Sequence, residues 1–190
     1  MWPRICLAGA AVLGLSIGNA GAARAQAFTG AGPDGAARAA QSTTPAMIEG
    51  CILAAAQLHH LPPAVLVILL NVEGGAIGHV SRNTNDTVDI GPMQVNQIWL
   101  PQLARHWSAS ISATFLALRD NFCANVEGGA WILRQALDEA HGDFWQGVAI
   151  YHSHDPGYQH DYLSHVLREV ERLDPASRSG RDPMRVAGGW

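Results

Sequence analysis

The chain has 190 residues, of which 48% are hydrophobic and 15% are charged, a composition that suits one globular domain with a hydrophobic core. The length leaves little room for a second full domain. The formal net charge is −4 at neutral pH, so the surface will not attract nucleic acid or an anionic polysaccharide electrostatically. Any carbohydrate ligand would therefore be held by local hydrogen bonds and stacking.

Residues 1–25 have the pattern of a secretory signal peptide. Arg4 precedes an apolar run over residues 5–17, and residues 23–25 form a small-x-small cleavage site. The apolar stretch is almost as long as the roughly 20 residues of a membrane span, so an uncleaved anchor is the alternative. The glycines and alanines at its end favour cleavage, which would leave a periplasmic protein without a stable membrane anchor.

Three cysteines are present, and Cys6 would be removed with the signal peptide. Cys51 and Cys123 would remain in an oxidising compartment, where one disulfide is the simplest interpretation. On the loop-entropy model such a bridge would stabilise the fold by about 4 kcal/mol. Two free buried cysteines are the structural alternative.

The composition along the chain predicts one domain between two irregular ends. Residues 26–44 are rich in Ala, Gly, Ser and Thr and indicate a flexible leader. Residues 174–190 are rich in Pro, Gly, Arg and Ser, and we expect a disordered tail there. The expected domain spans residues 45–173.

Apolar spacing predicts a helix over residues 46–60, which begins near Thr44 and Pro45. Residues 64–73 form a second helix that is apolar on every side, typical of a buried core helix. Residues 74–93 indicate a loop with a short β-hairpin around residues 86–90. Further helices are expected over residues 96–106, 112–119, 122–141, 143–153 and 158–173. The predicted fold is mainly α, with a small irregular or β-hairpin lobe.

Glu73 ends the apolar helix and is followed by two glycines. The exposed carbonyls of a helix C-terminus and the apolar neighbours both disfavour a carboxylate, so the pKa of Glu73 should rise. A raised pKa is what a general acid requires. The hexapeptide NVEGGA recurs at residues 125–130, where Glu127 is expected to be a solvated residue of a first helical turn.

Polar and glycine-rich residues follow in the segment DIGPMQVN, residues 89–96, and a tyrosine occurs in the later segment IYHS. One carboxylate with hydrogen-bonding groups, and no obvious second carboxylate, is an unusual inventory for cleaving a glycosidic bond. Ordinary glycosidases use two carboxylates. A sugar that supplies its own nucleophile would need only one.

Several segments in this order resemble the soluble lytic transglycosylases, over roughly residues 45–165. They are Cys51, the apolar helix that ends at Glu73, and the segments NTNDTVDIGPMQVN, FCANVEGGAWIL and IYHS. The likeness is greatest to small members that accompany conjugation, secretion and pilus systems. The resemblance implies a lysozyme-like fold with a glycan cleft, and cleavage of the MurNAc-β-1,4-GlcNAc bond to leave a 1,6-anhydro end. It implies no cofactor and no metal.

The resemblance also assigns roles to individual residues. Gln94 and Asn96 would hold the sugar chain, Gly91 would permit close backbone approach, Met93 would lie against the cleft and Tyr151 would orient the acid. Each has a simpler alternative: the two amides as helix caps, and the methionine and tyrosine as core residues.

Two positions depart from the family pattern. Gly74 stands where Ser is usual, and it would serve as a helix stop that leaves space for sugar. His152 stands where Asn is usual, and would either replace the missing hydrogen bond or face solvent.

Three other functions compete with this one. Asp89 is the candidate for a second carboxylate, which would make the protein a hydrolytic muramidase, although we expect it to bind backbone amides of its own loop. A non-catalytic peptidoglycan-binding assembly factor is the second alternative. A zinc peptidase is the third, built on His152, His154, His160 and His165, although no HExxH spacing is present. Trp99, Trp107, Trp131 and Trp145 are expected to be core residues, with sugar stacking as the alternative.

Overall fold

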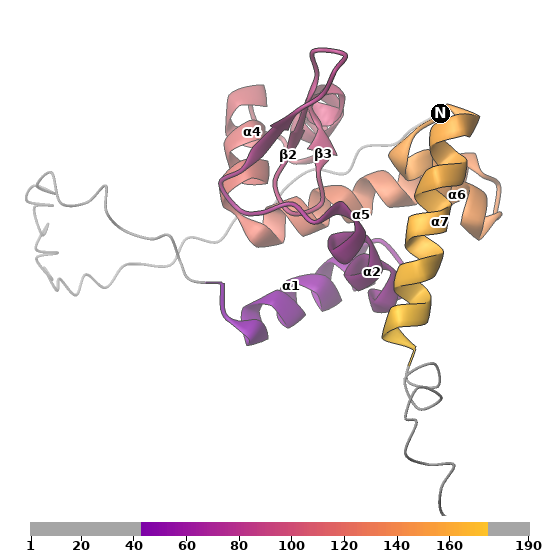
Figure 1. Ribbon diagram of the computed structural model, residues 1–190. Helices are drawn as coiled ribbons and strands as arrows, with labels where there is room; N and C mark the ends of the chain where they lie inside the picture. Colours follow the sequence, from indigo (N-terminus) through magenta and orange to yellow (C-terminus); the bar gives the residue numbers. More distant parts are fainter. Residues whose placement is uncertain (1–42, 175–190) are drawn as a thin grey trace, which may run out of the picture. The chain divides into compact units, whose positions relative to one another are not determined.

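The computed structural model describes residues 43–174, which are mainly helical and carry a small antiparallel sheet of three strands (Figure 1). This arrangement confirms the predicted mainly α class with a small β lobe. The elements in chain order are α1 (Pro45–Leu58), α2 (Pro63–Glu73), β1 (Val80–Arg82), β2 (Val88–Ile90), β3 (Val95–Asn96), the short 3-10 helix η2 (Gln97–Trp99), α3 (Leu100–His106), α4 (Ile111–Asp120), α5 (Phe122–Glu139), α6 (Phe144–His152) and α7 (Pro156–Leu173). The predicted signal peptide, most of the leader and most of the tail lie outside the described residues.

The first two helices begin and end at the signals that the sequence contains. The Thr44 hydroxyl accepts a hydrogen bond from the backbone N–H of Met47 at 3.2 Å and caps α1. Pro63 begins α2, where a missing N–H costs nothing. Gly74 ends α2 in the left-handed conformation, with φ of 62°, so the expected helix stop is confirmed.

No single helix within residues 43–174 has the length and hydropathy to cross a membrane. The pair α1 and α2, bent by 120° at the break between them, meets that criterion by length and composition only.

The sheet has the order β1-β2-β3, so β2 is its central strand. Asp89 on β2 lies opposite Ser81 on one side and opposite Asn96 on the other. The hairpin between β1 and β2 is therefore longer than the one predicted around residues 86–90, and a third strand is added to it. Asn96 ends β3 and is also the N-cap of η2, because its side-chain oxygen accepts from the N–H of Ile98.

The helix predicted over residues 96–106 is broken in the structure. Its first part is the 3-10 helix η2, and α3 begins only at Leu100, with Pro101 in its first turn. Proline has no N–H to donate to the preceding turn, so a continuous α-helix would lose a hydrogen bond here. Pro101 therefore explains why η2 and α3 do not form one continuous α-helix.

Helix α5 lies at the centre of the packing, in contact with α1, α4, α6 and the strand β3. Its glycines allow close approach: a Cβ at Gly129 would lie 2.6 Å from the Met93 sulfur. The predicted disulfide joins Cys51 on α1 to Cys123 on α5. Helix α7 packs against α2 and α6, as Figure 1 shows, and this contact brings the C-terminal helix beside the end of α2.

A fully buried amide connects α5 to the β lobe. The Asn125 side chain donates to the carbonyls of Ile90 and Leu118, both at 2.9 Å, and accepts from the N–H of Met93 at 2.7 Å. Gly91 makes room for it, because a Cβ there would lie 2.4 Å from the amide nitrogen of Asn125. The turn after β2 is thus held against α5 and α4 by one side chain.

We predict that Asn125→Ala lowers the free energy of unfolding by on the order of 3 kcal/mol, because three buried backbone groups lose their partner. Urea unfolding followed by circular dichroism measures this. Asn71 begins the other copy of the hexapeptide, and its exposed side chain donates to Glu169, so Asn71→Ala is the matched control with an expected loss under about 0.5 kcal/mol. Equal losses in the two variants would contradict the role given to Asn125.

Candidate active site

Glu73 is the last residue of α2, and burial is the main influence on its carboxyl group. Its pKa is raised to about 7: desolvation is the largest cause, the hydrogen bond from Tyr162 lowers the pKa in part, and the nearby charge of Asp89 adds to the rise. The side chain is only partly buried, so this carboxyl group combines a desolvated setting with an opening to solvent. Near neutral pH, Glu73 can therefore both give and accept a proton.

Tyr162 of α7 is the residue that holds this acid in place. Its hydroxyl donates to Glu73 Oε1 at 2.6 Å, and the tyrosine itself is buried. Burial and the neighbouring Glu73 carboxylate both raise the pKa of Tyr162, so the hydroxyl stays protonated and keeps its role as a donor. The contact between α7 and α2 fixes the direction of the carboxyl group.

Tyr151 was expected to orient the acid, and the structure corrects this expectation. The Tyr151 hydroxyl donates instead to the backbone carbonyl of Met93 at 3.0 Å. Burial raises the pKa of Tyr151 well above its usual value, and Glu73 and Asp89 add to that shift, so both carboxyl groups lie near this ring. Tyr151 thus lines the site but orients the turn, whereas Tyr162 orients Glu73.

Met93 is fully buried, so the simpler alternative of a core side chain describes it and its expected place against a cleft is wrong. Gly91 is also buried, with φ of 69°, and the groups that it allows to come close are the Leu118 carbonyl and the Asn125 side chain of the same protein. Both residues shape the turn that carries the polar groups, and neither offers a surface to a ligand.

His152 lies beside the acid through its contact with Tyr162. The two rings are stacked, with centroids 4.3 Å apart and an interplanar angle of 4°. Burial lowers the pKa of His152, the Asp89 carboxylate raises it in part, and His165 lowers it. The imidazole is therefore neutral at pH 7 and can accept or donate a hydrogen bond at the edge of the site, where it keeps solvent exposure.

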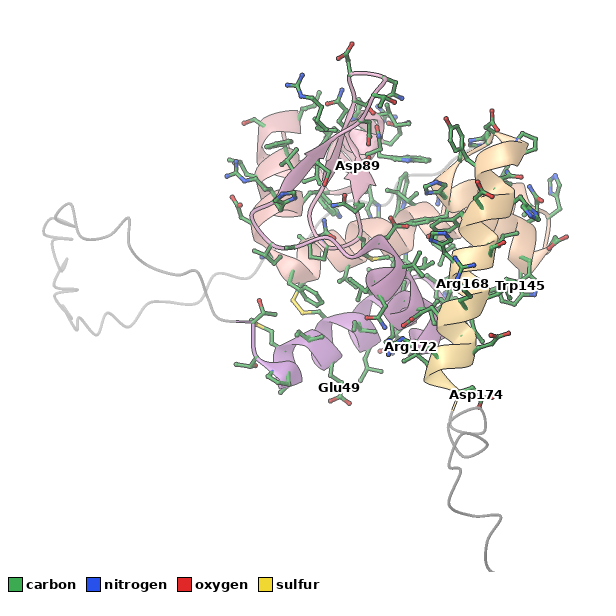
Figure 2. All side chains as sticks on the ribbon, viewed as in Figure 1. Glu49, Asp89, Trp145, Arg168, Arg172 and Asp174 are labelled. Carbon is green, nitrogen blue, oxygen red and sulfur yellow. A yellow bond between two sulfur atoms is a disulfide. The ribbon has the colours of Figure 1, made fainter. Side chains whose placement is uncertain are left out.

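Asp89 is held by side-chain amides, where backbone amides were expected. Asn96 donates to its Oδ1 at 2.7 Å and Asn83 donates to its Oδ2 at 2.9 Å. The cross-strand pairing of Asp89 with Asn96 produces the first contact. Both carboxylate oxygens thus accept a hydrogen bond from a side-chain amide. Figure 2 labels Asp89 on the small sheet.

Gln94 lies directly against the chain that follows Glu73. Its amide donates to the Gly91 carbonyl at 2.8 Å, and a Cβ at Gly75 would lie 2.6 Å from the amide nitrogen. The backbone N–H of Gly75 also donates to the Pro92 carbonyl at 3.2 Å. Gln94 therefore lies beside the segment that follows the acid, and its amide braces the turn and caps no helix. Its expected role in holding the sugar chain stays a prediction.

An apolar pocket of the described residues does not contain the acid. This pocket of about 360 Å³ lies between α1, α2 and the start of α5, and Ile48, Val67 and Phe122 are among its lining residues. We place the candidate site at Glu73 because the pocket offers no titratable group. Of the four tryptophans within residues 43–174, Trp99, Trp107 and Trp131 pack against the core as expected. Trp145 on α6, labelled in Figure 2, is instead 44% exposed.

Glu127, expected to be solvated, is instead partly buried in α5 and bound by three donors. His59 and His106 contact its Oε1 through Nε2 at 2.7 and 2.9 Å, and the Trp107 indole N–H donates to its Oε2. The helix begins at Phe122, so Glu127 lies beyond the first turn and faces α1 and α3. The prediction failed because these partners are distant in sequence.

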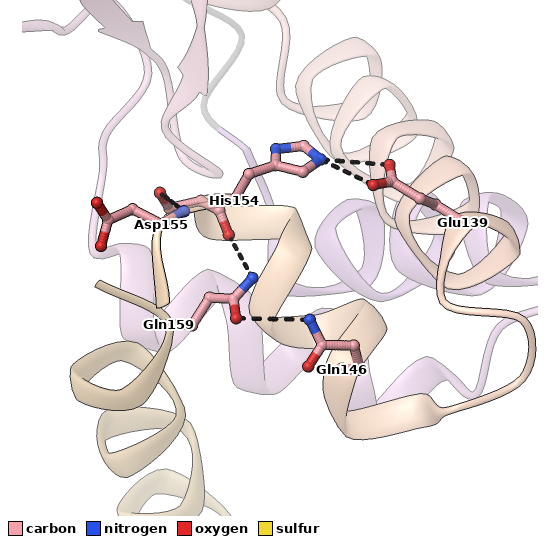
Figure 3. Close-up of polar contacts among 6 residues, drawn as sticks. Glu139, Gln146, His154, Asp155 and Gln159 are labelled. Carbon is pink, nitrogen blue, oxygen red and sulfur yellow. Dashed lines mark hydrogen bonds and ion pairs between the residues drawn. The ribbon is translucent and has the colours of Figure 1, made fainter. Parts of the chain in front are cut away.

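The histidines of the suggested zinc peptidase do not converge in the described residues. His154 pairs with Glu139 at 3.0 Å on an exposed surface, and Gln159 donates to the Ser153 carbonyl at 2.9 Å beside it (Figure 3). His152 stacks on Tyr162, away from this pair. Asp155, the next residue after His154, caps α7 by accepting from the N–H of Gly157.

Sequence reasoning missed three residues that position the site. Tyr162 holds Glu73, Asn83 holds Asp89 and Asn125 holds the turn after β2. Tyr162 shares the buried face of α7 with Val166, one turn later, so a tyrosine in an apolar helical stripe was the available signal. Asn83 and Asn125 stand in segments that carry the resemblance, but these segments do not show which groups the two amides bind. The Asn83 amide donates to Asp89 across its own hairpin, and Asn125 binds groups that are distant in sequence.

Comparison of the sequence with protein-family models and with curated proteins gave no significant match.

The raised pKa of Glu73 predicts that the stability of the folded protein depends on pH. Between the ordinary value of 4.5 and about 7 the folded protein binds this proton more tightly than the unfolded chain, so stability is lost as pH rises through that window. Glu73→Gln should abolish this loss, so its stability relative to wild type should increase from pH 4 to pH 8 by up to about 3 kcal/mol. Urea unfolding at several pH values measures it, with the exposed Glu49→Gln as control. A pH-independent difference would contradict the assigned pKa.

Removal of the Tyr162 hydroxyl should raise the pKa of Glu73 above about 7, because the hydrogen bond that favours the anion is lost. Tyr162→Phe and wild type would be titrated by carbon-13 NMR of the glutamate carboxyl groups. Tyr158→Phe, on the exposed side of the same helix, should leave the titration unchanged. A lower pKa in Tyr162→Phe would show that Tyr162 does not donate to the anion.

Proposed function

We propose that this protein is a peptidoglycan lytic transglycosylase of lysozyme-like fold, which cleaves the MurNAc-β-1,4-GlcNAc bond and leaves a 1,6-anhydro-MurNAc end. The sequence resemblance suggests this activity, and the observation that carries it is the state of Glu73. A partly buried carboxyl group at a helix end, with a pKa of about 7 and a fixed orientation, suits a general acid.

In the proposed reaction Glu73 gives its proton to the glycosidic oxygen as the C1–O bond of the muramoyl sugar breaks. The resulting carboxylate then removes the proton of the C6 hydroxyl, whose oxygen forms the new bond to C1. The enzyme regains its proton and no water is consumed. The pKa near 7 serves both steps, because the same group must first be an acid and then a base.

The residues around Glu73 would assist by position. Tyr162 holds the acid, and the neutral imidazole of His152 and the amide of Gln94 offer hydrogen bonds to sugar hydroxyls. Asn96 would act mainly through Asp89, since its amide nitrogen donates to that carboxylate. Met93 and Gly91 would act by supporting the turn.

Hydrolysis is the second candidate, because the charge of Asp89 reaches Glu73 and raises its pKa. A muramidase of that kind would use Asp89 as nucleophile or base, at a separation set by the mechanism. We favour transglycosylation because both Asp89 oxygens already accept amide hydrogen bonds, which leaves the carboxylate less free to attack a sugar. The two reactions differ in their products.

The predicted signal peptide would place this activity in the periplasm. There it would open glycan strands locally, and components of a secretion, conjugation or pilus apparatus would be its partners. The resemblance alone suggests these partners.

Digestion of purified peptidoglycan, with the muropeptides identified by mass spectrometry, tests the proposal. Wild type and the exposed control Glu49→Gln should release anhydro-muropeptides, and Glu73→Gln should release them at least 100-fold more slowly, because the general acid is lost. Circular dichroism would verify that both variants are folded.

Each alternative gives a different result in the same experiment. Reducing-end muropeptides from wild type would indicate a muramidase. Binding of peptidoglycan without any cleavage would indicate an assembly factor, and peptide cleavage that a chelator stops would indicate a zinc peptidase. Any of these three results would overturn the proposed transglycosylase.

A further inference from the structure

The residues around Glu127 form a second polar centre, built from three elements that do not carry Glu73. His59 follows the last residue of α1, His106 is the last residue of α3, and Glu127 lies within α5. We call these three residues the His59–His106–Glu127 cluster. Their ligand atoms all lie within 4.8 Å of one another.

We propose that the His59–His106–Glu127 cluster binds one zinc ion. Two imidazole nitrogens and one carboxylate oxygen are a ligand set that zinc uses in proteins, with a fourth position left for water. The exposed fractions of the three side chains are 7%, 30% and 20%, so the site is sheltered by His59 and open to solvent beside His106.

The geometry points to one shared position for the ion. Both Nε2 atoms are directed at the same carboxylate oxygen, at 2.7 and 2.9 Å. A tetrahedral zinc ion with bonds of about 2 Å holds its ligand atoms roughly 3.4 Å apart. Side-chain rotations that open the two contacts by about 0.7 and about 0.5 Å would therefore admit the ion, with each imidazole protonated on Nδ1.

A further group of aromatic contacts fixes the proposed ligands. The Trp107 indole N–H donates to the second oxygen of Glu127, which leaves Oε1 for the ion. Trp131 stacks on the His106 ring, with centroids 5.2 Å apart, and restricts its rotation. Such outer contacts orient ligands in metal sites. The disulfide between Cys51 and Cys123 removes these two thiols as competing ligands.

The consequence would be structural, because the ion would tie together the end of α1, the end of α3 and the middle of α5. This role is separate from the proposed reaction at Glu73, in which no metal takes part. The inference does not rest on the proposed function and is tested by binding alone.

The test is a titration of the untagged, chelator-treated full chain with zinc chloride, by isothermal calorimetry and by thermal unfolding. We expect one zinc ion per chain and a melting temperature that rises with zinc but not with magnesium. His106→Gln, at a partly exposed position, should weaken binding at least tenfold and abolish the thermal shift. Glu127→Gln should act in the same way, and cobalt in place of zinc should give the visible absorption of a tetrahedral ion in wild type only.

His154→Gln is the matched control, because it removes another histidine paired with a glutamate, on an exposed surface (Figure 3). It should bind zinc like wild type. Absence of one-to-one binding by wild type would overturn the proposal, and so would equal affinity in a folded His106→Gln variant. Equal loss in His154→Gln would indicate binding at surface histidines, and would overturn it as well.

Discussion

One buried amide determines where the candidate active site is assembled. Asn125 holds the turn after β2 against α5 and α4 through three hydrogen bonds. Carbonyls of this turn also accept hydrogen bonds from the Gly75 N–H and the Tyr151 hydroxyl. Gly75, which follows the helix cap Gly74, is thereby fixed to the β lobe. Because a buried amide must satisfy its donors and acceptor, the turn has one position relative to α5.

The carboxyl groups of Glu73 and Asp89 lie near each other but in different surroundings. Glu73 is desolvated and has one donor, the Tyr162 hydroxyl, whereas Asp89 accepts from Asn83 and Asn96. The charge that Asp89 carries in this setting raises the pKa of Glu73 further. A carboxyl group that is desolvated beside a second carboxylate can remain a proton donor near neutral pH.

The repeated hexapeptide NVEGGA shows how far tertiary context overrides local sequence. In the first copy Asn71 is exposed and Glu73 ends a helix with a raised pKa. In the second copy Asn125 is fully buried and Glu127 lies inside a helix, bound by two histidines and a tryptophan. Identical neighbours thus produce a candidate acid at one place and a candidate metal ligand at the other.

The sequence by itself determined the helical class, the caps at Thr44 and Gly74, the core helix α2 and the pairing of Cys51 with Cys123. These features could be predicted because hydrophobic spacing, capping chemistry and cysteine count are local or compositional signals. Only the tertiary structure decided that Tyr162 is the partner of Glu73, since these residues are 89 positions apart. Contacts of that kind depend on which helix faces pack together, and apolar periodicity shows that a face is buried without showing what covers it.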